Sequence, residues 1–203
     1  LRLEDPSQPL VLISQKATRG GTEVFVYCKD QAALFATVVA ELDRRNFNVH
    51  DAQVMISKDG HVLDTFIVLD QHGEAIDEAR HKAVAKHLTH VLADGRPTKI
   101  KTRRTPRNLQ HFKVKTLVEF LPTKSKKRTL MELRALDTPG LLAQVGATFA
   151  ELDINLHGAK ITTIGERAED LFILTSDAGG RLSEEQEQAL RERLTEHVSE
   201  LAP

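Results

Sequence analysis

The chain has 203 residues, of which 40% are hydrophobic and 28% are charged, and its formal net charge is −1. This composition is typical of an ordinary soluble globular protein. The single cysteine, Cys28, excludes an internal disulfide, and no apolar run is long enough to span a bilayer. We therefore expect a cytoplasmic protein with no membrane partner. The chain starts at Leu1 and not at a methionine, as a piece of a longer protein would.

The first half of the chain alternates between strand-like and helix-like patterns. Apolar spacing predicts helices over 32–45 and 76–93, the second ended by Gly95. The Asp-Gly pair in Lys58-Asp59-Gly60 predicts a hairpin turn. The order is β-α-β-β-α-β, the split arrangement of ferredoxin-like domains. A preceding apolar run predicts a buried or edge strand, and the expected strands are 9–13, 22–28, 49–57, 61–70 and 98–102.

The second half repeats this order up to its last helix. Strands are expected over 112–121, 129–136, 154–164 and 168–175, with helices over 140–152 and from Ser183 onward. No strand follows the last helix. We therefore expect the strand 112–121, which precedes the repeat, to cover the open edge of the sheet, with 9–15 as its counterpart in the first half.

The similarity of the two halves extends to individual residues. A shift of 107 positions superimposes 30–56 on 137–163 with eight identities. After one deleted residue, Asp64-Thr-Phe66-Ile67 superimposes on Asp170-Leu-Phe172-Ile173. A unit of about 100 residues, the usual size of a small domain, has thus been used twice. We predict a first domain over 1–104, a linker over 105–110 and a second domain over 111–203.

The turn Asp137-Thr138-Pro139-Gly140-Leu141 lies between an expected strand and an expected helix. Asp137 can cap the free amides of the first helical turn. Gly140 has no side chain, so a ligand can come close to the backbone. Free amides at a helix start attract negative groups such as a carboxylate. The turn is therefore a candidate docking point for a small anionic molecule.

Several sequence motifs resemble those of a known family. A strand, an Asp-x-Pro-Gly-Leu turn, a helix and then Asn155-Leu-His157 resemble the ACT domain, a small module that binds amino acids. Longer motifs resemble the C-terminal tandem ACT-domain region of the bacterial bifunctional uridylyltransferase/uridylyl-removing enzymes. These motifs are Arg19-Gly-Gly-Thr-Glu23, Ala40-Glu-Leu-Asp-Arg-Arg45, Val49-His-Asp-Ala-Gln53, Asp64-Thr-Phe-Ile-Val68, Leu156-His-Gly-Ala-Lys-Ile161, Thr163-Ile-Gly-Glu-Arg167 and Glu169-Asp-Leu-Phe172.

The resemblance implies an α+β fold of two ferredoxin-like βαββαβ ACT domains, with antiparallel sheets and helices on one face. It implies a regulatory region that senses glutamine, in an enzyme that modifies and demodifies the PII nitrogen-signalling protein. The catalytic domains lie upstream in that family and carry its Mg²⁺, so we expect no catalytic residues and no cofactor in this chain. The expected partners are glutamine, the upstream domains of the same chain and, through the whole enzyme, PII.

The resemblance also suggests which residues bind the ligand. The α-carboxylate of glutamine would take amides near Gly140 and Leu141, while Asn155 and His157 would serve its other polar groups. The first repeat lacks Pro and Gly in the equivalent turn. Because ACT domains often pair edge to edge, a site can combine the turn of one repeat with the strand of the other. The predicted set is Asp137, Thr138, Pro139, Gly140, Leu141, Asn155 and His157, with Asp30, Gln31, Ala33, Leu34, Asn48 and His50 from the first repeat.

Other functions compete with amino-acid sensing. A ligand-free ACT-type docking or dimerisation module needs only the sheet edges. RNA binding would use a basic belt over 96–128, which holds twelve Lys and Arg against Glu119, but the chain has no Trp and one Tyr for base stacking. The pair His50-Asp51 lies in an expected strand, whose neighbouring side chains point to opposite faces, and His81, His87 and His90 lack a further ligand type. We therefore expect no metal site and no nucleic-acid partner.

Overall fold

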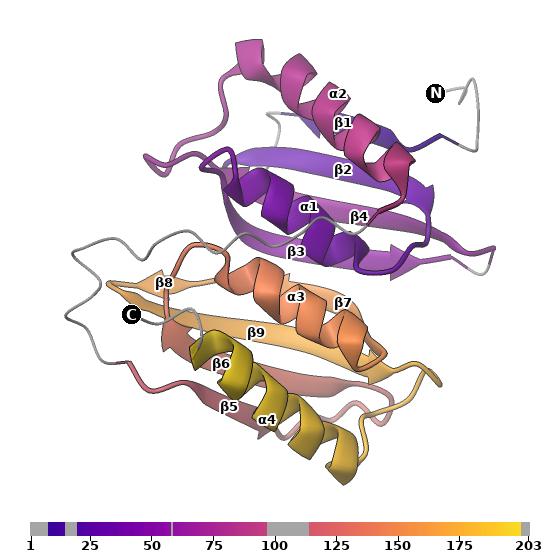
Figure 1. The fold of residues 1–203 in the computed structure, drawn as a ribbon, viewed down its shortest axis with the longest axis vertical. Helices are drawn as coiled ribbons and strands as arrows, with labels where there is room; N and C mark the ends of the chain where they lie inside the picture. The colour runs from indigo at the N-terminus through magenta and orange to yellow at the C-terminus, as the bar shows by residue number, and fades with distance from the viewer. Residues whose placement is uncertain (1–7, 15–19, 58, 97–113, 200–203) are drawn as a thin grey trace.

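The computed structural model describes residues 8–14, 20–57, 59–96 and 114–199. Within them, nine strands form one antiparallel sheet in the order β1-β2-β4-β3-β7-β9-β6-β5, with β8 paired to β9. The four helices cover one face of this sheet (Figure 1). The strands are β1 Leu10–Ser14, β2 Thr22–Lys29, β3 Asn48–Ile56, β4 His61–Leu69, β5 Leu117–Leu121, β6 Thr129–Leu136, β7 Ile154–Lys160, β8 Thr163–Ile164 and β9 Arg167–Ser176. The helices are α1 Leu34–Asp43, α2 Glu78–Asp94, α3 Leu141–Glu151 and α4 Glu184–Ser199.

These elements confirm the predicted fold class. Strand β1 pairs with β2 and β5 pairs with β6, so the two strands that precede the repeats form the edges of the sheet, as expected. The predicted strand 98–102 and the predicted linker 105–110 lie outside the described residues. The domain boundaries therefore stay a prediction.

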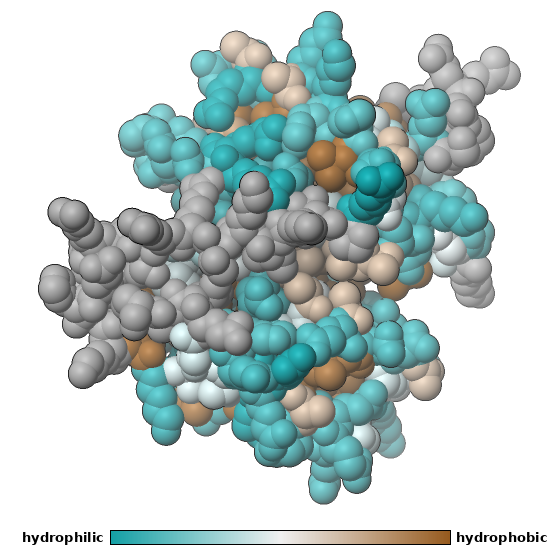
Figure 2. All heavy atoms as spheres, viewed as in Figure 1, coloured by the Kyte–Doolittle hydropathy of each residue, from teal (hydrophilic) through white to brown (hydrophobic). Residues whose placement is uncertain are grey.

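Alternation in sequence accounts for the strands. In β2, Val24, Val26 and Cys28 face the helices and are buried, while the residues between them are partly exposed. The inward side chains of both halves join one hydrophobic core. Figure 2 shows the helix-bearing face, where hydrophilic side chains predominate and hydrophobic ones form scattered patches. Among the described residues, no helix is long and apolar enough to cross a membrane.

The two repeats meet at the centre of the sheet through β3 and β7. Ala52 pairs with Ala159, its own equivalent under the 107-residue shift. On either side, Asp51 pairs with Lys160 and Gln53 pairs with Gly158. These pairings exchange under the same shift, so an approximate two-fold axis passes between the two alanines. The repeats therefore share one sheet, in which the start of β3 lies towards the end of β7 and the start of β7 towards the end of β3.

Helices α1 and α3 also pack against each other across this axis. A Cβ atom added to Gly146 would lie 2.6 Å from Phe35 Cδ1 and 3.2 Å from Ala36 Cα. That spacing leaves no room for a side chain, so Gly146 permits the close approach of the two helices. The starts of both helices are consequently held at fixed positions relative to the opposite repeat.

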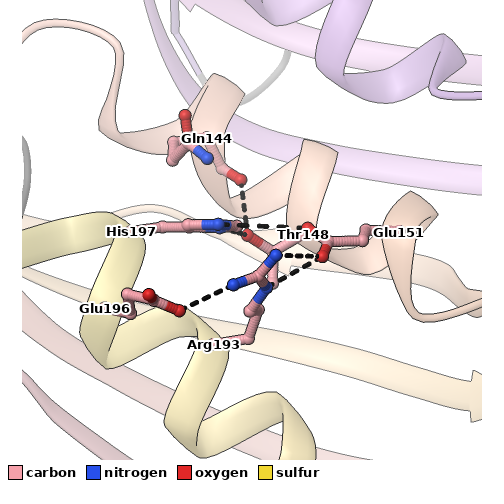
Figure 3. A network of polar contacts seen from close by, with 6 residues as sticks. All are labelled: Gln144, Thr148, Glu151, Arg193, Glu196 and His197. Carbon is pink, nitrogen blue, oxygen red and sulfur yellow. Dashed lines mark hydrogen bonds and ion pairs between the residues drawn. The ribbon is translucent and has the colours of Figure 1, made fainter.

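Helix α3 is further held by polar contacts to α4 (Figure 3). Thr148 Oγ1 lies 2.9 Å from His197 Nδ1 and donates to the Gln144 carbonyl at 2.9 Å. Arg193 donates from Nε to Glu151 Oε1 at 2.8 Å. These contacts involve the middle and end of α3, so its first turn is left open towards the first repeat.

Candidate ligand site between the two repeats

Helix α3 begins with unused amides. Gly140 is its N-cap residue with φ 86°, in the left-handed region where glycine avoids the strain of a side chain. No side chain caps this helix, and the Leu142 and Ala143 amides have no acceptor among the described residues. The prediction that Asp137 caps the helix is wrong. Because the helix starts only at Leu141, Asp137 lies three residues before the N-cap, and its carboxylate accepts from Thr163 Oγ1 at 2.9 Å.

A cleft of about 490 Å³ lies between this helix start and the first repeat, and we call it cleft 1. Its volume falls in the usual range of small-molecule sites. The turn 137–141 forms one wall, and the beginning of β3 forms the facing wall. Thr138 is 6% exposed and its Oγ1 has no partner among the described residues. The polar lining residues are Asp43, Asn46, Asn48, His50, Gln71, Asp137, Thr138, Thr163 and Asp170.

His50 reaches this cleft because the β3 strand is irregular. The register of β3 against β4 shifts between Val49 and Asp51, so His50 is the extra residue of a β-bulge. Bulges redirect side chains and are frequent beside functional sites. Burial lowers the pKa of His50, with a further lowering from Lys160 and an opposing effect of Asp137. His50 is thus neutral at pH 7, where its imidazole can both donate and accept.

The equivalent histidine, His157, is also a bulge residue but points elsewhere. The register of β7 shifts between Leu156 and Gly158, and His157 Nε2 lies 2.9 Å from Thr175 Oγ1. His157 lines neither of the two inter-repeat clefts. Its predicted place beside the turn 137–141 is therefore not found in the structure.

Two aspartates, Asp137 and Asp170, place carboxylates in the lining of cleft 1. Asp170 is 1% exposed, and burial raises its pKa to about 7 despite a hydrogen bond from the Thr162 amide at 3.2 Å. Burial also raises the pKa of Asp137, against the lowering effect of its bond to Thr163. A cation entering here would take the place of the water that these groups have lost. Cleft 1 therefore offers free amides for an anion and carboxylates for a cation.

A second cleft, of about 330 Å³, is related to the first by the approximate two-fold axis, and we call it cleft 2. The start of α1 and the beginning of β7 form its walls. Ala33 is the N-cap residue of α1 with φ 56°, and the Phe35 and Ala36 amides have no acceptor among the described residues. Asn155 lines this cleft and donates from Nδ2 to the Ser176 carbonyl at 3.4 Å. The open helix start is therefore present twice.

Asp64 in cleft 2 is the equivalent of Asp170. It is 1% exposed, and neither of its carboxylate oxygens has a partner among the described residues. Burial raises its pKa to about 7, with an added contribution from Asp30. Burial, with smaller effects of Asp64 and Asp30, also raises the pKa of the Cys28 thiol to about 12. Cys28 is therefore an inert buried thiol at neutral pH.

The structure thus divides the predicted residues between the two clefts in a crossed pattern. Each cleft combines the turn of one repeat with the strand of the other, the arrangement that edge-to-edge pairing suggested. Asp64 and Asp170 were missed, although each is an acid at an inward position of an apolar strand, repeated in both halves. Cleft 1 contains Asp137, Thr138, Pro139, Gly140, Leu141, Asn48 and His50, and cleft 2 contains Asp30, Gln31, Ala33, Leu34 and Asn155.

Metal-ligating side chains do not cluster in the part of the chain that the structure describes, where no three His, Cys, Asp or Glu residues could hold an ion. Two of the helical histidines have protein partners instead. His81 Nε2 lies 2.9 Å from the Ile76 carbonyl, and His87 Nε2 lies 2.8 Å from Glu41 Oε2.

The chain is similar to a protein family, to curated enzymes and to a solved structure. Residues 129–194 match the ACT domain family. The chain is 98% identical over all 203 residues to the bifunctional uridylyltransferase/uridylyl-removing enzyme of Vibrio atlanticus, and 80% identical over 203 residues to that of Vibrio vulnificus. It spans 23% of the length of each. An aspartate kinase structure from Synechocystis is 14% identical, with a TM-score of 0.48, and its match covers 91% of this chain and 30% of that one.

The ACT match covers the repeat that carries the Asp-Thr-Pro-Gly turn, and the identities to the Vibrio enzymes extend over the whole chain. The chain therefore contains an ACT domain and corresponds over its whole length to a region of the bifunctional uridylyltransferase/uridylyl-removing enzymes.

Proposed function

We propose that this region senses glutamine and that cleft 1 is the glutamine site. The observation that supports this most directly is the pairing of an uncapped helix start with one buried and one half-buried carboxylate in a single cleft of small-molecule size. A free amino acid carries one negative and one positive group at a fixed separation. A site for it therefore needs amide donors and an acid close together, and cleft 1 has both.

Each polar group of glutamine has a counterpart in the cleft. The α-carboxylate takes the Leu142 and Ala143 amides, where the helix dipole favours an anion. The ammonium group lies towards Asp137 and Asp170. The side-chain amide needs paired donors and acceptors, which the carboxamides of Asn46, Asn48 and Gln71 supply at the opposite wall.

The names of the relatives suggest what the sensing controls. They combine a uridylyltransferase and a uridylyl-removing activity in one chain. In our proposal, glutamine bound here favours removal of the uridylyl group from PII over its addition. The catalytic domains and their Mg²⁺ belong to the remainder of the enzyme. This chain contributes an equilibrium between two conformations that biases the catalytic domains. Glutamine shifts that equilibrium only if it binds the two conformations with different affinities.

Calorimetric titration of this chain with L-glutamine tests the proposal. We expect saturable heat with L-glutamine and much weaker binding of D-glutamine, whose groups cannot meet the same three partners. Gly140→Val should weaken L-glutamine binding at least about a hundredfold, because its side chain fills the approach to the free amides and strains a residue with φ 86°.

Gly179→Val is the matched control, because Gly179 also has a positive φ, 82°, with no atom within 4 Å of an added Cβ, and it does not line cleft 1. It reproduces the backbone strain and should leave glutamine affinity unchanged. Heat that is absent at millimolar glutamine would favour a docking or dimerisation module. Equal affinity in both valine variants would place the glutamine site outside cleft 1.

A further inference from the structure

We propose that cleft 2 is a separate binding site that selects an amino acid with a cationic side chain, such as lysine, over glutamine. This inference uses the proposed mode of amino-acid binding at a helix start but concerns the other cleft. It rests on the residues that differ between two otherwise equivalent sites and on a buried carboxylate without a partner.

The two clefts keep equivalent aspartates in their lining. Asp30 and Asp64 in cleft 2 are the equivalents of Asp137 and Asp170 in cleft 1. Both clefts also have an asparagine at the start of the facing strand and two free amides at the helix start. The parts that would hold the shared α-ammonium and α-carboxylate groups of any amino acid are therefore duplicated.

The rims of the two clefts differ in charge. Asn46 in cleft 1 corresponds to Asp153 in cleft 2, and both have left-handed backbones, with φ 58° and φ 52°. Gln71 in cleft 1 corresponds to Asp177 in cleft 2. Each replacement exchanges a neutral carboxamide for a carboxylate at the same place. A neutral amide side chain suits the first rim, and a positive side chain suits the second.

Cleft 2 is lined by acids and not by bases in the part of the chain that the structure describes. Its titratable lining residues there are Asp30, Asp64, Asp153 and Asp177, with no Lys, Arg or His among them. The facing positions of β3, β4 and α3 are otherwise apolar, namely Val54, Ile56, Val62, Gly146, Phe149 and Ala150. Cleft 1 has one acid fewer, and its third acid, Asp43, already has an interaction partner.

Asp64 supplies an independent indication of a bound cation. A buried carboxylate without a hydrogen-bond donor is costly, and such groups in native structures call for an explanation. Asp64 lies at the inner end of cleft 2, 1% exposed, with both oxygens lacking a partner among the described residues. An ammonium group is the donor that this position lacks, and burial, which raises the pKa of Asp64, is offset by such a neighbour.

The spacing of the acids favours an elongated organic cation over a metal ion, since no three of the described metal-ligating side chains lie close enough to share an ion. Lysine carries one carboxylate and two ammonium groups. Its carboxylate takes the Phe35 and Ala36 amides, its α-ammonium lies towards Asp30 and Asp64, and its side-chain ammonium reaches the rim at Asp153 and Asp177.

Amide chemical shifts of the isotope-labelled chain, titrated with L-lysine and separately with L-glutamine, test this inference. We expect lysine to shift the amides of 30–36 and 153–156, and glutamine to shift those of 137–143. In the double variant Asp153→Asn, Asp177→Asn, lysine affinity should fall at least about tenfold, since hydrogen bonds to charged groups are lost. Asparagine tolerates the left-handed backbone at position 153, so the fold should be kept.

The control variant Glu184→Gln, Glu192→Gln removes the same charge from exposed positions of α4 and should leave lysine affinity unchanged. Equal lysine affinity in both double variants, or glutamine shifting both clefts alike, would overturn the inference. So would displacement of lysine by micromolar Mg²⁺. Failure of glutamine at cleft 1 with lysine binding intact would contradict only the proposed glutamine site, and the reverse outcome would contradict only this one.

Discussion

Cleft 1 and cleft 2 descend from one repeated unit, and comparing them separates what the scaffold needs from what a ligand selects. Both keep an uncapped helix start, a buried strand aspartate and an asparagine on the facing strand. They differ at the N-cap, which is Gly140 in cleft 1 and Ala33 in cleft 2. They also differ at the rim, which has carboxamides in cleft 1 and carboxylates in cleft 2. In our proposal, the features held in common recognise any amino acid, and those that differ determine which amino acid is selected.

The largest expected effect comes from the buried aspartates. Burial raises the pKa of Asp64 and of Asp170 from 3.8 to about 7. An acid whose pKa is higher in the folded state contributes stability that is complete below its unfolded pKa and is lost as the pH rises through its folded pKa. A shift of about three units corresponds to about 4 kcal/mol per group. We therefore expect these groups to lower the free energy of unfolding as the pH rises from about 4 to about 7.

Urea denaturation of the chain and of Asp64→Asn and Asp170→Asn at several pH values measures this effect. Burial lowers the pKa of His50 and His157, which acts in the opposite direction, so the informative quantity is the difference between each variant and the unaltered chain. Asp64→Asn should flatten the profile at least as much as Asp170→Asn, because only Asp170 accepts the Thr162 amide. Parallel profiles for all three proteins would contradict the argument.

A smaller effect is expected where the two helices meet. Gly146→Val places a side chain in the same position as Val39 of the first repeat, but its Cβ would lie 2.6 Å from Phe35 Cδ1. Such overpacking costs about 1–3 kcal/mol, and moving α1 away from α3 should weaken ligand binding in both clefts. Thermal denaturation and titration measure the two effects. Gly180→Val, with no atom within 4 Å of the added Cβ, should change neither.

The N-cap difference predicts a gain in stability. Ala33 has φ 56°, a left-handed conformation that costs a residue with a side chain about 1–2 kcal/mol. Ala33→Gly removes this strain but makes the unfolded chain more flexible, so the net gain in the free energy of unfolding should be about 0.5–1 kcal/mol. The neighbouring Ala32→Gly, whose φ is not positive, should give no gain. A loss of stability in both variants would contradict the strain argument.

The smallest expected effect is at the central strand pair. Lys160 Nζ lies 3.4 Å from Asp51 Oδ2, and the lysine side chain is 61% exposed. The symmetry-related pair, Gln53 and Gly158, carries no charge. Lys160→Met should therefore cost only about 0.2–1 kcal/mol, and the difference should disappear in about 1 M salt. Lys82→Met, at an exposed position of α2, is the control, and an equal loss there would show that the contact does not stabilise the sheet.

Much of this fold can be predicted because it depends on local patterns. Alternation of apolar and polar residues predicts β2, β3 and β4, and the shift of 107 positions reveals the duplication. The edge positions of β1 and β5 follow from counting the strands of each repeat. These are properties of neighbouring residues or of direct self-comparison, so a single sequence displays them.

The composition of the site cannot be predicted in the same way. Pairing of β3 with β7 decides that Asn48 faces the turn of the other repeat, and that long-range choice leaves no local pattern. The orientation of His157 depends on a bulge and on Thr175. Asp64 and Asp170 lie within apolar strands, and a single acid in such a strand does not by itself predict a ligand-binding residue. The capping prediction for Asp137 fails because apolar spacing does not define the first residue of α3.

The antiparallel pairing of β3 with β7 has a consequence for how the chain responds to the concentration of a ligand. Neither pocket exists within a single half, so an occupant of either one tethers both halves, and at a hundred times its Kd it holds them together by about 2.7 kcal/mol. By thermodynamic reciprocity, a partner whose binding depends on the contact between the two halves also changes the affinity of the ligands in the clefts. The ligand concentration would then set how strongly the two halves are held together along the β3–β7 pair.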